Sequence, residues 1–357
     1  MKTNRYKISL ITCLLILHYF PDNFSQERKY DLYGYGQVEY QASNKKNSIN
    51  GFNQRRINLI GEYFIDQNIR VLSDIEYEGG SELNTTDSIY NGGIKVSRMW
   101  IEYTLNPALN FRAGKMLSPF GLYNLIHDAS ASYYAVDAPL MYLRFKFFPG
   151  VRAQRLISKY NTGVSVFGTF NLNKQGSQIE YDLGISNGRG SLADGTDANQ
   201  NKAVYGRILF RPSFLNGLQF GTSYYADKNL SGIGGIENDY ETNLGIDFQY
   251  ENNSIQLQAE SMLSTFTNPT SVRQTTEVHY VQVAYTFWDV LTPFFNFTSV
   301  LPDFKNTENT YHRWNAGLNY AVSANLYLKS EIQFHTYEED NSENGFIVFK
   351  SSLAVAF

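Results

Sequence analysis

Residues 240–265, YETNLGIDFQYENNSIQLQAESMLST, contain two segments of alternating polarity on either side of a polar turn. From Tyr240 to Tyr250, apolar residues and one threonine alternate with polar residues and glycine. From Ile255 to Leu263, the same period of two sets apolar side chains against glutamines and a glutamate. This period is typical of a β-strand with one apolar and one polar face. The stretch predicts two adjacent strands joined at Glu251-Asn252-Asn253.

The pattern recurs along the chain and predicts an all-β fold, a transmembrane antiparallel β-barrel. Each segment has roughly the 9–11 residues that a tilted membrane strand needs. The sixteen predicted strands are 30–42, 52–64, 69–79, 94–105, 109–117, 161–172, 178–187, 202–211, 217–227, 239–251, 254–265, 276–288, 291–300, 311–322, 325–337 and 346–357.

The connections between these strands alternate in length. Tight turns such as Asp66-Gln67-Asn68 and Asn106-Pro107-Ala108 alternate with longer polar loops such as 80–93 and 188–201. Short turns at one rim and long loops at the other are typical of outer-membrane barrels. Because lipid offers no hydrogen-bond partner, every strand edge in such a protein must be paired. We therefore expect the last strand, which ends on Phe357, to close the ring against 30–40.

The N-terminus predicts export. Lys2, Arg5 and Lys7 precede an apolar run that is too short to span a membrane as a helix. This arrangement is typical of a secretory signal peptide. We expect residues 1–25 to be cleaved after Ser25, leaving 26–357 as the mature barrel. The mature chain then has 27 basic and 33 acidic residues and lacks Cys13, so the sequence predicts neither a disulfide nor nucleic-acid binding.

Signals for enzymatic or metal chemistry are weak. The chain has five histidines, and no pair of them has the spacing of metal ligands. Gly114-Lys115 lacks the upstream glycine and the following Ser or Thr of a phosphate-binding loop. We therefore expect no enzyme activity, no metal and no cofactor.

One long segment interrupts the strand pattern. After Lys115 the regular alternation stops, and it resumes near Asn161. A barrel of sixteen strands is too wide for side chains to fill and is expected to hold an aqueous channel.

Several motifs in residues 50–212 resemble the outer-membrane porin superfamily, in particular phosphate-selective porin-like proteins (porin O/P type) of Gram-negative bacteria. The motifs are Arg55-Arg56, Gly114-Lys115 with Ser118-Pro119-Phe120-Gly121, Asn187-Gly188-Arg189-Gly190 and Arg207 to Pro212. The resemblance implies that the loop after the fifth strand, 118–160, folds into the lumen and narrows it. The dense basic ladder of phosphate-selective porins has no residue-by-residue match in this chain.

Strand parity predicts which charged side chains line the pore, because a charge on the lipid face costs roughly 2–4 kcal/mol near the midplane. The expected pore-lining residues on the wall are Arg70, Asp74, Glu76, Arg98, Glu102 and Arg112. The inner loop is expected to add basic side chains to a constriction, namely Arg144, Lys146, Arg152, Arg155 and Lys159, against Asp128 and Asp137. These basic residues either attract anions or pair with wall carboxylates such as Asp74, Glu76 and Glu102.

These features favour a passive channel for small hydrophilic solutes with a weak preference for anions. One alternative is a solute-specific pore for an oxyanion or sugar, with a stacking surface of Tyr123, Tyr133, Tyr134 and Tyr142. Another is a non-conducting surface barrel plugged by its loop. The expected partners are outer-membrane lipid and lipopolysaccharide, the barrel assembly machinery and, by resemblance, two further copies in a homotrimer.

Overall fold

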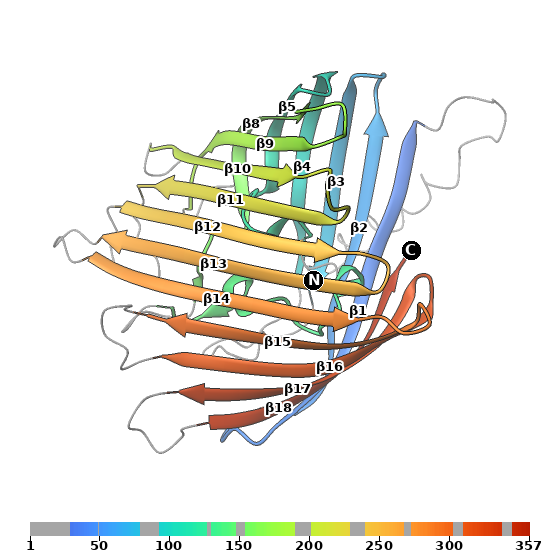
Figure 1. The fold of residues 1–357 in the computed structure, drawn as a ribbon, viewed down its shortest axis with the longest axis vertical. Coiled ribbons are helices and arrows are strands. Elements are labelled where there is room, and N and C mark those ends of the chain that lie inside the picture. The colour runs from blue at the N-terminus through green and yellow to red at the C-terminus, as the bar shows by residue number, and fades with distance from the viewer. Residues whose placement is uncertain are drawn as a thin grey trace, which may run out of the picture.

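A computed structural model describes residues 29–48, 50–78, 93–126, 130–147, 154–189, 201–228, 240–267, 273–302, 310–337 and 345–357. The predicted signal peptide lies outside these residues. Sixteen of the strands form one closed antiparallel barrel (Figure 1). They are β1 Tyr30–Ser43, β2 Gly51–Phe64, β3 Ile69–Glu78, β4 Gly93–Asn106, β5 Leu109–Leu117, β8 Tyr160–Asn171, β9 Gln178–Ser186, β10 Ala203–Arg211, β11 Leu218–Asp227, β12 Tyr240–Glu251, β13 Ile255–Thr267, β14 Arg273–Tyr285, β15 Leu291–Leu301, β16 Tyr311–Ser323, β17 Leu326–Tyr337 and β18 Gly345–Ala356.

The barrel confirms the predicted fold class. Every strand pairs with its neighbours in the chain, except that β5 pairs with β8 and β1 pairs with β18. Between β5 and β8 lie three short 3-10 helices and a two-stranded ribbon, which are η1 Asn124–Ile126, η2 Ser130–Ser132, η3 Leu140–Tyr142, β6 Arg144–Phe145 and β7 Gln154–Arg155. In the described part of the chain, no helix is long and apolar enough to cross a membrane.

The ring closes at Phe357. Its N–H donates to the Gly34 carbonyl at 2.9 Å, and the Gly34 N–H donates back to the Phe357 carbonyl at 2.7 Å. Regular pairing then runs from Tyr35 opposite Ala356 to Ser43 opposite Val348. The observed pairing of β18 with β1 is therefore shifted by several residues from the expected range 30–40. The first residues of β1 extend beyond the chain end, so they pair only with β2.

The largest difference from the predicted strand bounds is at β14, expected at 276–288 and found at Arg273–Tyr285. Tyr285 and Phe287 continue the alternation of apolar residues, but Phe287 belongs to a tight turn that forms an isolated bridge with Leu291. Trp288 and Asp289 occupy left-handed conformations, with φ of 52° and 61°. Alternation alone does not reveal such a turn, because its first residues, Phe287 and Trp288, are themselves aromatic.

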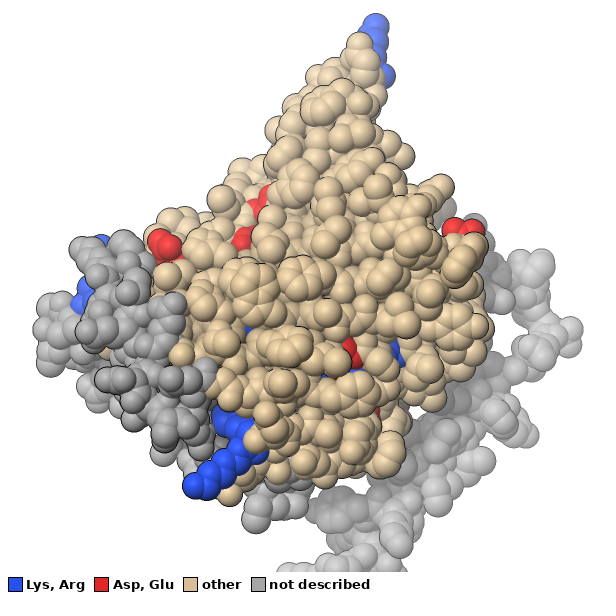
Figure 2. Space-filling view, turned by 60° about the horizontal axis from the view of Figure 1, so that its bottom comes forward, with Lys and Arg blue, Asp and Glu red and all other residues tan. Residues whose placement is uncertain are grey.

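The outer face of the barrel is apolar. Outward side chains with large exposed areas include Ile101, Ile185, Ile246 and Leu353. Over the side that Figure 2 presents, Lys, Arg, Asp and Glu are sparse and most of the surface is uncharged. The inner face carries the charged and amide side chains, so the two faces of each strand differ as the period of two predicts.

Candidate functional site: the charged lumen and its inner segment

The chain from Ser118 to Lys159, here called the inner segment, contacts inward-facing side chains of the wall. In Figure 1 its teal and green ribbon lies behind β12, β13 and β14. One attachment uses Glu260 of β13, which accepts hydrogen bonds from the Leu122 N–H and from the Tyr142 hydroxyl, each at 2.5 Å. Burial, followed by the charge of Glu260, raises the pKa of Tyr142 well above its usual range, so this hydroxyl remains a donor.

Gly121 is required at this attachment. Its φ is +65°, and a Cβ there would overlap the Tyr142 hydroxyl. Its N–H donates to the Ser223 hydroxyl of β11 at 3.1 Å. The predicted motif Ser118-Pro119-Phe120-Gly121 thus forms a close approach between backbone and wall that a larger residue would prevent.

A second attachment uses Lys329 of β17, which is fully buried. Its Nζ donates to the carbonyls of Ser130, Tyr133 and Ala135, the last at 3.1 Å. One ammonium has three donors, so Lys329 satisfies three carbonyls of the inner segment at once and fixes its path beside β17.

A third attachment is an ion-pair cluster on Asp137. Lys350 of β18 lies 2.6 Å from one carboxylate oxygen, and Arg55 of β2 lies 3.0 Å from the other. Burial by itself would raise the pKa of Asp137, but Lys350 and then Arg55 outweigh it and hold that pKa well below its usual range. Asp137 is therefore a carboxylate that joins the inner segment to both sides of the barrel closure.

Apolar packing completes the contact with the wall. Phe120, Met141 and Phe147 of the inner segment are almost fully buried. They belong to one cluster with wall side chains such as Tyr225 and Met262. The hydrophobic core of the described residues thus lies largely inside the barrel, between the segment and β10 to β16.

The wall from β2 to β5 carries a ladder of alternating charges. Arg98 pairs with Asp74 at 2.9 Å, and Glu102 accepts from both Arg70 and Arg112 at 2.7 Å. The guanidinium groups of Arg70 and Arg112 also lie over the Trp100 ring, 5.1 and 4.8 Å from its centroid. The described members are five basic and five acidic residues, namely Arg56, Arg70, Lys95, Arg98, Arg112, Glu62, Asp74, Glu76, Glu78 and Glu102.

A register shift on β4 places Arg98 in this ladder. Asp74 pairs with Arg98, but the next residue, Ile75, pairs with Val96. The extra residue, Ser97, is fully buried and donates to Glu76. A bulge of this kind re-aims side chains, so Ser97 and Arg98 both serve the inner face.

The predicted wall residues Arg70, Asp74, Glu76, Arg98, Glu102 and Arg112 are thus brought together. Asp74, Glu76 and Glu102 pair with basic residues of the wall itself. On the inner segment, Arg144 and Arg155 are opposite each other in the β6–β7 ribbon, and Lys146 is exposed. Arg155 donates to the Tyr142 carbonyl, and Lys159 lies over the Tyr160 ring. Arg152 and Asp128 lie outside the described residues.

The proposed tyrosine stacking surface is wrong for three of its four members. Tyr123, Tyr133 and Tyr142 are 3%, 9% and 5% exposed, respectively. They pack in the contact between the inner segment and the wall, where Tyr123 donates to Gln258. Their rings fill the interior instead of facing a solute, and only Tyr134 is half-buried.

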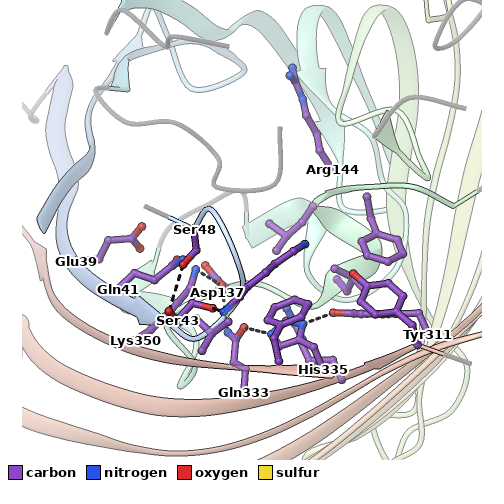
Figure 3. Close-up of a pocket in the computed structure, with 18 of the residues that line it drawn as sticks. Glu39, Gln41, Ser43, Ser48, Asp137, Arg144, Tyr311, Gln333, His335 and Lys350 are labelled. Carbon is purple, nitrogen blue, oxygen red and sulfur yellow. Dashed lines mark hydrogen bonds and ion pairs between the residues drawn. The ribbon is translucent and has the colours of Figure 1, made fainter. Parts of the chain in front are cut away.

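Four basic residues that were not predicted to line the pore prove to face inward, namely Arg55, Arg313, Lys329 and Lys350. Arg55, Arg313 and Lys350 line one cavity together with Asp137, Gln333 and His335. Figure 3 labels Lys350, Asp137, Gln333 and His335 of this group. The alternation of the strands could have placed Arg313 and Lys329 inside, because their neighbours Trp314 and Leu328 are apolar and exposed. The partners of Lys329 on the segment, the carbonyls of Ser130, Tyr133 and Ala135, carried no pattern in the sequence.

Another polar group faces outward. His279 Nδ1 lies 3.0 Å from the Ser261 hydroxyl, and its Nε2 lies 3.4 Å from Glu277. The neighbouring Met262 and Val278 are buried on the inner face, so this group belongs to the outer surface and not to the lumen.

Comparison with known proteins gives the fold. No family model matches the chain. An uncharacterized protein of Aquifex aeolicus (strain VF5) is 24% identical over 226 residues, which cover 59% of this chain and 46% of the relative. The chain therefore spans less than half the length of this relative.

Solved structures of outer-membrane channels share the architecture. The anion-selective porin from Comamonas acidovorans has a TM-score of 0.66 at 12% identity, over 92% of this chain and 99% of that chain. Salmonella typhi OmpF in complex with daunomycin gives 0.61 at 12% identity, over 92% and 97%. The outer-membrane channel DcaP of Acinetobacter baumannii gives 0.56 at 12% identity, over 94% and 99%. At these identities the likeness concerns the fold.

Proposed function

We propose that this protein is an outer-membrane porin, a passive diffusion channel for small hydrophilic solutes. The observation that carries the proposal is the closed sixteen-stranded barrel with an apolar outer face and a charged inner wall. An apolar outer face is the low-energy solution in lipid. A barrel of this size encloses more space than side chains fill. Export through the cleaved signal peptide 1–25 and assembly of 26–357 by the barrel assembly machinery belong to this proposal.

The inner segment is proposed to form the constriction. Its three attachments, at Glu260, Lys329 and Asp137, hold it against one side of the lumen. The charge ladder of β2 to β5 is on the wall beside it, where Arg70 and Lys95 remain partly exposed. Solutes would pass between the segment and this ladder. A narrow, water-filled gap of this kind focuses the field of the charges that line it.

The segment is proposed to bias the channel towards anions. The ladder is balanced, but the described parts of the segment carry Arg144, Lys146, Arg155 and Lys159 against Asp137 alone. Asp137 is already engaged by Lys350 and Arg55. Excess basic side chains in a pore favour anions. The Comamonas relative in fold is named as anion-selective, which supports this direction; the resemblance to phosphate-selective porins makes phosphate one anion to test.

Reconstitution in planar bilayers tests the proposal. We expect a stable, linear conductance. In a salt gradient, we expect a reversal potential whose sign shows that anions permeate more readily than cations. Cation preference would refute the anion bias, and the absence of conductance would favour the non-conducting barrel. Native electrophoresis with crosslinking tests the homotrimer, which the trimeric form named for Vibrio cholerae OmpT makes worth examining.

A further inference from the structure

Arg313 of β16 is a buried cation that forms no ion pair with any of the described residues. Its side chain faces inward and the residue is 3% exposed. Within the described ranges no residue forms a hydrogen bond or an ion pair with its guanidinium, and its buried Nε has no partner. A buried charge without compensation is strongly unfavourable. A protein that keeps one beside an open cavity has a position prepared for an anion.

Such a cavity adjoins Arg313. It lies between the inner segment and strands β1, β2, β16, β17 and β18, with a volume of about 80 Å³ (Figure 3). Its charged lining residues are Glu39, Lys45, Arg55, Asp137, Arg144, Arg313 and Lys350. Its lining also includes the aromatic residues Phe145, Tyr311, Tyr337 and Phe346. In Figure 3, Arg144 points away from this group into the space above it.

The charges around the cavity do not cancel. Arg55 lies 3.0 Å from Glu39 and 3.0 Å from Asp137, and Lys350 lies 2.6 Å from Asp137. The two carboxylates are therefore matched by Arg55 and Lys350. Arg313 remains as a third buried cation, and Lys45 at the rim of the cavity adds a further positive charge. One monovalent anion against Arg313 would neutralise the set formed by Glu39, Asp137, Arg55, Lys350 and Arg313.

The aromatic lining residues indicate what the anion carries. Phe145 and Tyr311 lie with ring centroids 4.6 Å apart, and Tyr311 and Tyr337 lie 4.8 Å apart, which gives a continuous apolar surface. An inorganic oxyanion would leave this surface unused, whereas an alkyl group would bury against it. A cavity of roughly 150 Å³ is known to hold benzene, so one of about 80 Å³ suits a smaller, aliphatic group.

We propose that this cavity is a binding site for a short-chain aliphatic carboxylate of about two to four carbons. The carboxylate would accept hydrogen bonds from the Arg313 guanidinium, whose planar fork matches it. The alkyl chain would lie against Tyr311 and Tyr337. The inference rests on the proposed function, since the solute reaches the cavity through the channel.

Equilibrium dialysis of radiolabelled propionate against the full-length, detergent-solubilised protein tests this site. We expect saturable binding of one propionate per chain, displaced by acetate and butyrate but not by propanamide, the uncharged isostere. Arg313→Gln should weaken binding at least tenfold. Lys174→Gln, which removes a positive charge from the β8–β9 turn at the opposite rim, should bind as the native protein does. Heat-modifiable migration on electrophoresis checks that each variant is a folded barrel.

The outcomes separate the alternatives. If the native protein shows no saturable binding of propionate, the proposed site is wrong. It is also wrong if folded Arg313→Gln binds propionate as tightly as the native protein does. If phosphate or nitrate displaces propionate as well as acetate does, the site is a general anion site and the carboxylate assignment is wrong. This competition uses the native protein, so it decides even if Arg313→Gln fails to fold. A conducting channel without propionate binding refutes only this inference, whereas absent conductance refutes the proposed function.

Discussion

The Lys350 ammonium lies 2.6 Å from the Asp137 carboxylate, so the closing strand of the barrel is ion-paired with the segment inside it. β18 also forms the seam with β1, and Arg55 of β2 reaches the other oxygen of the same carboxylate. The position of the inner segment is thus coupled to the closure of the ring. Both charges are largely removed from water. Breaking a buried pair of this kind leaves one charge without compensation.

Asp137→Asn should therefore lower stability at neutral pH by roughly 3–5 kcal/mol, the usual cost of removing one partner of a buried pair. Because the folded-state pKa of Asp137 is depressed, its contribution to the free energy of unfolding is present above the unfolded pKa of about 3.9. It is lost as the pH falls through the folded pKa. Urea unfolding in detergent at pH 7 and at decreasing acid pH measures both effects.

The native protein should lose more stability between pH 4 and pH 2 than Asp137→Asn does. Asp31→Asn is the matched control, because Asp31 is an exposed residue at the start of β1. It should leave both the neutral stability and the acid limb unchanged. Parallel acid limbs in the native protein and Asp137→Asn would contradict the assigned role of the ion pair.

Tyr142→Phe removes one of the two hydrogen bonds that the inner segment makes to Glu260. Glu260 is buried, so its carboxylate would lose a donor without gaining water, at a cost of about 1–3 kcal/mol. We expect a barrel that still folds but whose segment moves more, seen as added noise and brief closures in single-channel recordings. Tyr285→Phe, on the outer face, is the control; a quiet Tyr142→Phe channel would show that this bond does not hold the segment.

The strands were predictable because their signal is local. From Tyr240 to Tyr250 the alternation of side chains alone identifies β12 and both its faces. The same parity placed Arg70, Arg98 and Arg112 inside. Arg98 was correct although the bulge at Ser97 shifts the register, because parity was counted from Ile101 and Tyr103 on the far side of the bulge.

The attachments of the inner segment were not predictable, because each depends on residues far apart in the chain. Nothing near Lys329 in the sequence indicates that it binds the carbonyls of Ser130 and Tyr133. The tyrosines of the segment were assigned to a solute surface because aromatic residues serve both binding and core packing. Only the wall residues opposite them, such as Met262 and Tyr280, show that packing is their role.

The double variant Arg144→Glu/Lys146→Glu reverses two exposed charges of the segment. If the segment sets ion preference, the reversal potential in a tenfold salt gradient should move towards cation selectivity, with conductance changed less than twofold. Lys174→Glu/Lys202→Glu reverses the same number of charges outside the segment and should leave the potential close to native. If the reversal potential of Arg144→Glu/Lys146→Glu also stayed close to native, the ion preference would be assigned to the wall ladder instead.

Gly34 forms the last contact of the ring, where its backbone pairs with Phe357. A Cβ at Gly34 would overlap the Asn58 carbonyl and would lie 2.8 Å from the Phe357 ring. Since the first of these is backbone, Gly34→Ala cannot be relieved by a side-chain rotation, and overpacking of this kind costs roughly 1–3 kcal/mol. Gly36→Ala is the matched control, because its Cβ would meet neighbours at 3.6 Å or more. We expect a lower urea midpoint for Gly34→Ala alone. Equal midpoints in the two variants would mean that the seam at Phe357 can open without weakening the barrel.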